Sequence, residues 1–496
     1  MKKIILLIVI VSVQIIPQET PLEKNNYQKL TSYAELSEFV YELDSLFDFL
    51  KVEIIGKSVE GRNLYALKFS NSEFGKETSK IKVLIFAQQH GDEQSGKEGT
   101  LLLACELLKP ENKYLFEKID LALVPQMNPD GSEKNVRRNS NEMDLNRNHL
   151  ILTEPETIAL HKLFDAYLFE VTMDVHEYYP YGESWKKYGY RENNDEEVGI
   201  LTNINAAANL RKLSNNIYLP FIKKYLNDRG FSFFEYCPGG PPEINYIRRS
   251  TFDINDGRQS LGIQNTFSFI QEGKNGKDSL DNIKRRLEGQ MTGMMGLVVF
   301  SYNHKDEIKN LVASEREKLE KAEVSNKVAI QLDHFSDGSK LEFPLLSYYS
   351  NKDTVITINN YRPVVKSLYD VERPEGYLIP KDLPELCDWA NRQNLVLTSL
   401  ENFSDFKIEQ YFISEIDSTD FEGDTIVNPI VESREFRNQI NPNDYYFIPS
   451  NQLKNNLIVI ALEPKSELGL VTYKNFEHLL KKAKYFPILR VVNQKK

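Results

Sequence analysis

Two histidines and a glutamate follow predicted buried strands and could hold one metal ion. The run KVLIFAQQ, residues 82–89, is nearly all apolar at its start and leads directly into His90-Gly91-Asp92-Glu93. Catalytic zinc sites use three protein ligands, which are drawn from nitrogen, sulfur and carboxylate oxygen donors. The third candidate is His176, near the end of a second predicted strand, VTMDVHEYY, in which Asp174 could orient a neighbouring group. The pattern therefore predicts a zinc site formed by His90, Glu93 and His176.

A long polar loop between these two strands carries three arginines. It reads NPDGSEKNVRRNSNEMDLNRN, residues 128–148, and contains Arg137, Arg138 and Arg147. Guanidinium groups in a cleft can bind a substrate carboxylate with two hydrogen bonds or stabilise a developing oxyanion. The alternative interpretation is an asparagine-rich turn with solvated arginines.

Strands and helices alternate along the first three-fifths of the chain and would position these side chains. The hydrophobic pattern predicts a helix over 31–50, two strands within 52–70, strands over 82–89, 119–128, 171–179 and 267–272, and helices over 99–108, 154–170 and 279–302. This order predicts an α/β fold with a mixed, mostly parallel sheet flanked by helices. Ligands of such sheets bind at the carboxyl ends of the strands, and the candidate residues follow those ends.

The last two-fifths of the chain differ in character. Residues 304–325 are highly charged and predict a surface helix that serves as a connector. From 326 to 496 the sequence predicts a smaller, mixed or β-rich C-terminal domain, with short β-rich runs at TVITI, NLVLTSL and NLIVIAL.

The N-terminus has the features of a secretory signal peptide, which we assign to residues 1–19. Lys2 and Lys3 precede an uncharged run over 4–17, which is shorter than the roughly 20 residues that a membrane span needs. We therefore expect an exported protein, which is periplasmic, at the cell surface or extracellular; an uncleaved signal anchor is the alternative. The net charge of −11 argues against nucleic-acid binding. Three widely separated cysteines do not form a disulfide framework.

Five motifs, in this order, resemble the zinc metallocarboxypeptidase family (carboxypeptidase A-like), and in particular its large exported bacterial type. They are HGDE, NPDG, RRNSNEMDLNRN, EPET and DVHEYYPYG, and the resemblance covers about residues 30–303. The resemblance implies a carboxypeptidase-like fold for a catalytic domain over 25–303. It also implies one zinc ion per chain, held by His90, Glu93 and His176.

The resemblance assigns further roles. Asn146 and Arg147 match the dipeptide that binds the substrate carboxylate, and Arg137 matches the arginine that stabilises the oxyanion, with Arg138 as the adjacent alternative. Glu272 ends a run, SFIQE, that resembles the strand carrying the general base. Tyr246 is nearest to the tyrosine that covers the substrate, although its spacing differs. Glu142-Met143 replace the Gly-Val of the family pattern.

The expected activity is hydrolysis of the C-terminal amide bond of a peptide or peptidoglycan-peptide substrate by a zinc-activated water, with Glu272 as general base. One alternative is a zinc amidohydrolase that acts on peptidoglycan stem peptides or N-acyl amino acids. A second alternative is a catalytically inactive peptide-binding protein. The presence of all three ligands and of Glu272 argues against it.

Overall fold

The computed structural model describes residues 18–399, 406–421 and 423–493. The predicted signal peptide lies almost entirely outside these residues. Within the described ranges, no helix is both long and apolar enough to cross a bilayer.

The N-terminal body contains one large sheet. Its strands are β1 (Leu50–Lys57), β2 (Asn63–Phe69), β3 (Ile81–Ala87), β4 (Ile119–Val124), β5 (Val171–Tyr178), β7 (Glu196–Gly199), β8 (Phe233–Glu235) and β10 (Phe267–Lys274). They lie in the order β1-β2-β4-β3-β5-β10-β7-β8. The central strands β4, β3, β5 and β10 are parallel, whereas β2 pairs antiparallel with β1 and β4, and β7 with β10. The predicted α/β fold with a mixed, mostly parallel sheet is confirmed.

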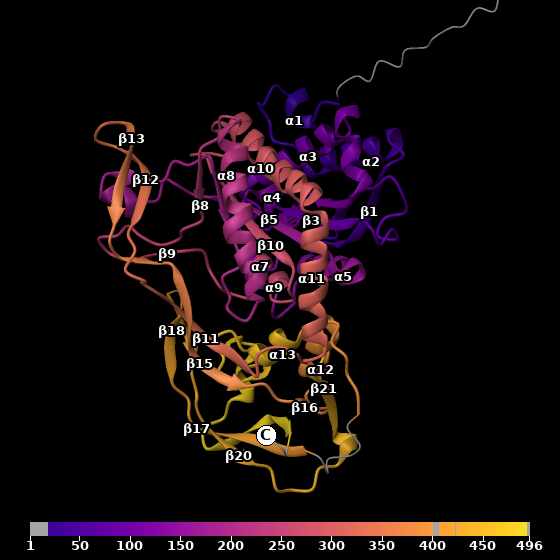
Figure 1. Ribbon diagram of the computed structural model, residues 1–496, viewed down its shortest axis with the longest axis vertical. Coiled ribbons are helices and arrows are strands. Elements are labelled where there is room, and N and C mark those ends of the chain that lie inside the picture. Colours follow the sequence, from indigo (N-terminus) through magenta and orange to yellow (C-terminus); the bar gives the residue numbers. More distant parts are fainter. Residues whose placement is uncertain (1–17, 400–405, 422, 494–496) are drawn as a thin grey trace, which may run out of the picture.

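Helices and short strands surround this sheet (Figure 1). They are α1 (Pro21–Lys24), α2 (Tyr33–Leu46), α3 (Gln94–Leu107), η1 (Pro110–Glu117), α4 (Pro129–Lys134), η2 (Leu145–Arg147), α5 (Pro155–Tyr167), α6 (Glu183–Lys187), β6 (Tyr190–Arg191), α7 (Ala208–Leu213), η3 (Ser214–Tyr218), α8 (Leu219–Asn227), β9 (Ile247–Arg248), α9 (Gly257–Gly262), α10 (Ile283–Asn303) and α11 (Lys305–Glu320). The start of α2 is fixed by a capping box, since Ser32 Oγ accepts from the Glu35 amide and the Glu35 carboxylate accepts from the Ser32 amide.

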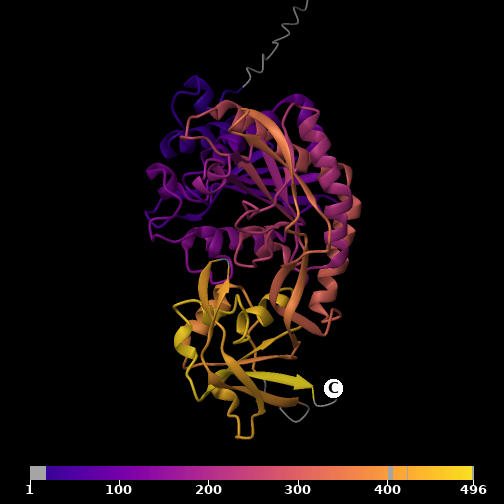
Figure 2. The same cartoon turned by 90° about the vertical axis from the view of Figure 1, so that its left-hand side faces the viewer.

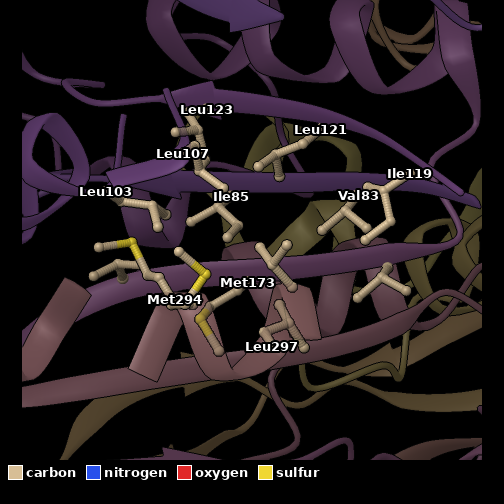
Figure 3. Packing of buried hydrophobic residues seen from close by; sticks show 14 of the residues in the cluster. Val83, Ile85, Leu103, Leu107, Ile119, Leu121, Leu123, Met173, Met294 and Leu297 are labelled. Carbon is tan, nitrogen blue, oxygen red and sulfur yellow. The ribbon is translucent and has the colours of Figure 1, made fainter. Parts of the chain in front are cut away.

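Alternate residues of the central strands face two separate cores. Val83 and Ile85 of β3 belong to the larger core, which α2, α3, α8, α10 and α11 cover. Figure 3 shows strand residues of this core, among them Leu121 and Met173, beside Leu103 and Met294 of the helices. Leu84 and Phe86 face the opposite side, against α5 and α9. Burial of the sheet on both faces explains why its strands read as continuous apolar runs.

The C-terminal part is rich in strands, as predicted. Its elements are β11 (Lys327–Phe335), β12 (Leu341–Ser347), β13 (Lys352–Ile358), β14 (Tyr361–Arg362), β15 (Val364–Glu372), β16 (Gly376–Pro380), α12 (Pro384–Arg392), β17 (Phe406–Glu415), β18 (Ser418–Phe421), β19 (Asp424–Val427), β20 (Ile430–Glu435), η4 (Pro442–Asp444), β21 (Tyr445–Pro449), α13 (Asn455–Leu462), η5 (Leu470–Thr472), η6 (Glu477–Leu479) and β22 (Lys484–Asn493). Five of its strands form a sheet in the order β20-β17-β22-β16-β21.

One hairpin of this C-terminal part returns to the N-terminal body. Strands β12 and β13 run along the N-terminal body (Figure 2), and β12 pairs with β6. The ring of Phe343 lies 5.8 Å from that of Trp185, between centroids, and β14 pairs with β9. The predicted division at residue 326 into two domains stays a prediction.

The run NLIVIAL, predicted as a β-rich run, is instead the helix α13, and that prediction is wrong. All its residues are buried, and a short apolar run that is buried all round has no periodicity that separates a strand from a helix. The described residues of NLVLTSL, 394–399, contain one isolated bridge, between Thr398 and Phe447, and no strand.

Candidate metal centre

His90, Glu93 and His176 meet at the carboxyl ends of β3 and β5. Their candidate ligand atoms all lie within 4.8 Å of one another, and all three residues are buried. The Glu93 carboxylate lies 2.7 Å from His90 Nδ1 through one oxygen and 2.9 Å from His176 Nδ1 through the other. The Nδ1 atoms are 3.2 Å apart. Both imidazoles thus turn the same nitrogen toward one point.

The other nitrogen of each imidazole faces an aspartate. His90 Nε2 lies 3.1 Å from Asp144 Oδ1, and His176 Nε2 lies 2.9 Å from Asp174 Oδ1. Carboxylates in this position fix the orientation and tautomer of metal-binding histidines. Burial by itself would lower the pKa of His176, but the carboxylates of Asp174 and Glu93 outweigh it and hold that pKa well above its ordinary value.

This donor set fits zinc. Two imidazole nitrogens and one carboxylate oxygen, buried and oriented from behind, are the ligand types of catalytic zinc sites, which leave a fourth position for substrate or water. Because the histidines must be neutral to bind a metal, binding would displace protons and its affinity would depend on pH.

Tight packing at the turn after β3 brings His90 and Glu93 together. A side chain at Gly91 would place its Cβ only 2.2 Å from the backbone of Gly131, so this position needs glycine. Asn128 of the NPDG motif caps α4 by accepting from the Gly131 amide at 2.8 Å. Its side-chain amide donates to the carbonyls of Gln89 and Arg137, each at 3.2 Å. The motif therefore joins the turn that carries His90 and Glu93 to the arginine loop.

Glu272 lies beside His176 on the neighbouring parallel strand, because the register of β10 and β5 pairs these two residues. Side chains at paired positions share one face of a sheet. Burial raises the pKa of Glu272 to about 7; the nearby imidazoles of His176 and His90 lower it and the Glu93 carboxylate raises it. A carboxyl group with such a pKa can exchange a proton near neutral pH.

Arg137 reaches the metal group, whereas Arg138 does not. Arg137 Nη1 lies 3.2 Å from His90 Nδ1 and 3.6 Å from Glu93 Oε1. Its Nη2 donates to Asp144 Oδ2 at 2.9 Å. Arg138 is exposed and donates to the carbonyl of Glu142 in its own loop at 2.9 Å.

Asn146 and Arg147 follow within the same loop, in η2. The Asn146 side-chain oxygen accepts from the Gly257 amide at 2.8 Å and from Gln89 Nε2 at 3.2 Å. Gly257 can approach so closely because it lacks a Cβ, which would lie 2.6 Å from Asp174 Oδ2. Arg147 is exposed, and its Nη1 donates to the Asn146 carbonyl at 2.9 Å.

Tyr246 is placed in a different surrounding. It is half-buried, and the Arg362 guanidinium lies 3.8 Å from the centroid of its ring. It lines a hollow of about 700 Å³ between the 239–252 loop and the C-terminal part. This surrounding is separate from the group of His90, Glu93 and His176, and the role of Tyr246 stays a prediction.

Asp144 and Gln89 are structural partners that the sequence argument did not identify. Asp144 contacts His90 and Arg137 and caps η2 by accepting from the Asn146 amide at 2.9 Å. Gln89 donates to both oxygens of Asp174, at 3.0 and 2.8 Å. The signal for Asp144 was its place two residues before Asn146 in the motif MDLNRN.

Comparison with known proteins agrees with this centre. Residues 38–227 match the sequence model of the zinc carboxypeptidase family. Carboxypeptidase 2 of Trichophyton rubrum is 22% identical over 430 residues, which cover 83% of this chain and 77% of that protein. Carboxypeptidase D of Mus musculus is 30% identical over 239 residues, or 40% of this chain and 17% of that protein. A metallo-carboxypeptidase from Pseudomonas aeruginosa, solved in complex with (2-guanidinoethylmercapto)succinic acid, aligns with a TM-score of 0.42 and 22% identity over 56% of this chain and 71% of that one. Residues 38–227, which hold His90, Glu93 and His176, therefore have the sequence of a zinc carboxypeptidase domain, and the relatives that match most of the chain are named carboxypeptidases.

Proposed function

We propose that this enzyme removes single residues from the free C-terminus of peptides, with His90, Glu93 and His176 as zinc ligands, Glu272 as general base and Arg147 with Asn146 as the carboxylate-binding pair. The observation that carries the proposal is the pairing of Glu272 with His176 on adjacent strands, beside a buried three-ligand group. Peptides with a free C-terminus are the substrate class that the names of the relatives suggest.

Different residues of the chain carry out different parts of the reaction. Zinc, when bound, supplies Lewis acidity that polarises the scissile carbonyl and acidifies a water. Glu272 accepts a proton as the water oxygen adds to the carbonyl carbon. When the carbon–nitrogen bond breaks, Glu272 returns that proton to the leaving amine. The Arg137 guanidinium, held by Asp144, stabilises the negative oxygen that forms.

Replacement of Arg147 tests whether the enzyme is an exopeptidase. We expect Arg147→Ala to raise KM for a blocked dipeptide with a free C-terminus about 100-fold, because a charge-assisted hydrogen bond to the carboxylate is lost, with a smaller change in kcat. The measurement is steady-state kinetics on that peptide and on its C-terminal amide.

Arg138→Ala is the matched control, since Arg138 contacts its own loop. We expect it to change KM by less than about three-fold. Equal turnover of the free acid and the amide by the wild-type enzyme would favour the amidohydrolase alternatives. Assays with N-acyl amino acids and with peptidoglycan stem peptides would then distinguish between those alternatives.

The raised pKa of Glu272 gives an expected pH dependence. A general base works only when deprotonated, so kcat/KM should fall as the pH drops through the pKa of this group, about ten-fold per pH unit. The limb should lie at or below about pH 7, since burial places the pKa of this group near 7 and the positive charge of a bound zinc ion would stabilise the carboxylate further. A profile of kcat/KM from about pH 5 to about pH 9 measures this, and constant activity over that range would contradict the assignment.

We also propose that the protein is exported, on the basis of Lys2, Lys3 and the uncharged run that follows them. N-terminal sequencing of the protein from the culture medium or the cell envelope tests this. Recovery only from the cytoplasm with Met1 retained would exclude export.

A further inference from the structure

The C-terminal part contacts the backbone just beyond Arg147. Trp389 of α12 donates from Nε1 to the carbonyl of Leu150 at 3.0 Å. Gln393, the residue after α12, donates from Nε2 to the same carbonyl at 2.6 Å and to that of His149 at 3.1 Å. Both donors are fully buried. We call residues 146–150, from Asn146 to Leu150, the clamp segment.

Helix α12 is itself attached to the N-terminal body. Lys454 Nζ donates to the Gln393 carbonyl at 2.7 Å and pairs with Asp165 of α5 at 2.9 Å, where both side chains are largely buried. Leu150 packs in one apolar cluster with Trp389. In Figure 1, α12 and α13 lie on the side of the C-terminal part that faces the N-terminal body. The donors to the clamp segment are therefore held in place by packing and by a buried ion pair.

The opposite side of the clamp segment is connected to the metal centre. His149 Nε2 lies 2.8 Å from Gln89 Oε1, and Gln89 Nε2 reaches Asn146 at 3.2 Å and Asp174 at 2.8 Å. Asp174 lies behind His176. The clamp segment thus lies between hydrogen bonds from the metal centre and hydrogen bonds from α12.

A second C-terminal side chain lies near Arg147. Burial raises the pKa of Tyr473 to about 12, while Asn255 and the charge of Arg147 act in the opposite direction. The Asn255 carbonyl accepts from the His149 amide at 3.2 Å. The C-terminal part thus approaches the clamp segment through two separate stretches of chain.

We propose that Trp389 and Gln393 are positioning residues that hold the Asn146–Arg147 pair in the geometry that binds the substrate carboxylate. The inference rests on the proposed carboxypeptidase function. Its consequence is that the C-terminal part completes the substrate site. Displacement of a binding group by about 1 Å can cost about 100-fold in rate, so loss of these two supports should be measurable.

The test removes the donors and keeps the packing. We expect Trp389→Phe/Gln393→Met to raise KM for a peptide with a free C-terminus about ten-fold and to change kcat by less than about two-fold. Turnover of the C-terminal amide should stay constant, so that the preference for the free acid falls by the same factor. Zinc content should remain one per chain.

Two control variants match these changes. Gln410→Met removes a glutamine that donates to the Phe486 carbonyl at 3.0 Å within the C-terminal part. Tyr377→Phe removes a buried hydroxyl that donates to Glu463 at 2.8 Å in the cluster that contains Trp389. Neither residue contacts the clamp segment through a hydrogen bond among the described residues. We expect both controls to keep the wild-type preference for the free acid.

The outcomes separate the two ideas. A wild-type enzyme that prefers the free acid, together with a double variant that behaves like the controls, would overturn the positioning role alone. A wild-type enzyme without that preference would overturn the proposed function and this inference with it. If the double variant is too unstable to purify, the single variant Gln393→Met is compared with Gln410→Met. The deciding quantity is again the preference for the free acid over the C-terminal amide. A fall in kcat with loss of zinc in Gln393→Met, at unchanged KM, would also overturn the positioning role.

Discussion

Replacing Glu272 by glutamine is expected to lower kcat by about 10²–10⁴-fold, because the amide cannot accept the proton of the attacking water. The substitution is nearly isosteric, and Glu272 is not one of the candidate zinc ligands His90, Glu93 and His176. Zinc content and KM should therefore change little. The measurement is single-turnover kinetics on a blocked peptide, together with elemental analysis of the purified variant.

Glu196→Gln is the matched control for this experiment. Glu196 is also a buried carboxyl group whose pKa is raised well above its ordinary value by burial. Its oxygen accepts from Gln271 at 3.1 Å. Gln271 precedes Glu272 on β10, so its side chain points to the opposite face of the sheet. We expect Glu196→Gln to keep most of the activity. If the Glu272→Gln variant also kept most of its activity, another group would have to be the base.

The sequence was informative about the metal group because its members lie at the ends of strands. A buried parallel strand is recognisable as a continuous apolar run, and the carboxyl ends of neighbouring parallel strands meet at one edge. His90, His176 and Glu272 each occupy such an end, after or within β3, β5 and β10. Their proximity therefore follows from local patterns and one rule of topology.

The supports of that group were less predictable. Asp144 and Gln89 lie in loops, and the contacts of a loop depend on the surfaces packed against it. The hydrogen bonds from Trp389 and Gln393 to the clamp segment join residues more than 200 positions apart in the chain. A single sequence contains no pattern that pairs them. The same limit applies to α13, whose fully buried apolar residues suit a strand or a helix equally well.

Replacing His176 by alanine is expected to remove zinc and to lower activity more than any change in the arginine loop. Loss of one of three ligands leaves two donors and an open cavity, and even partners behind the ligands contribute about 10–100-fold to metal affinity. Zinc that binds only the native enzyme raises its thermal midpoint by mass action. We therefore expect the wild-type midpoint to rise on zinc addition, and that rise to disappear in His176→Ala. Calorimetry and elemental analysis both measure this without depending on activity.

His161→Gln is the control for loss of a buried histidine. His161 contacts His149 at 3.0 Å and is not one of the three grouped residues. Burial holds its pKa well below the ordinary value, so the imidazole is neutral at pH 7 and a neutral amide keeps the local charge. The control should bind one zinc per chain with the wild-type shift in midpoint. If His176→Ala kept both its zinc and that shift, the metal would lie elsewhere, and the roles assigned to Glu93 and His90 would fall with it. If both properties were lost only in the ligand variant, the buried group at the ends of β3 and β5 would be the zinc site, and Glu272 would be correctly positioned to act there.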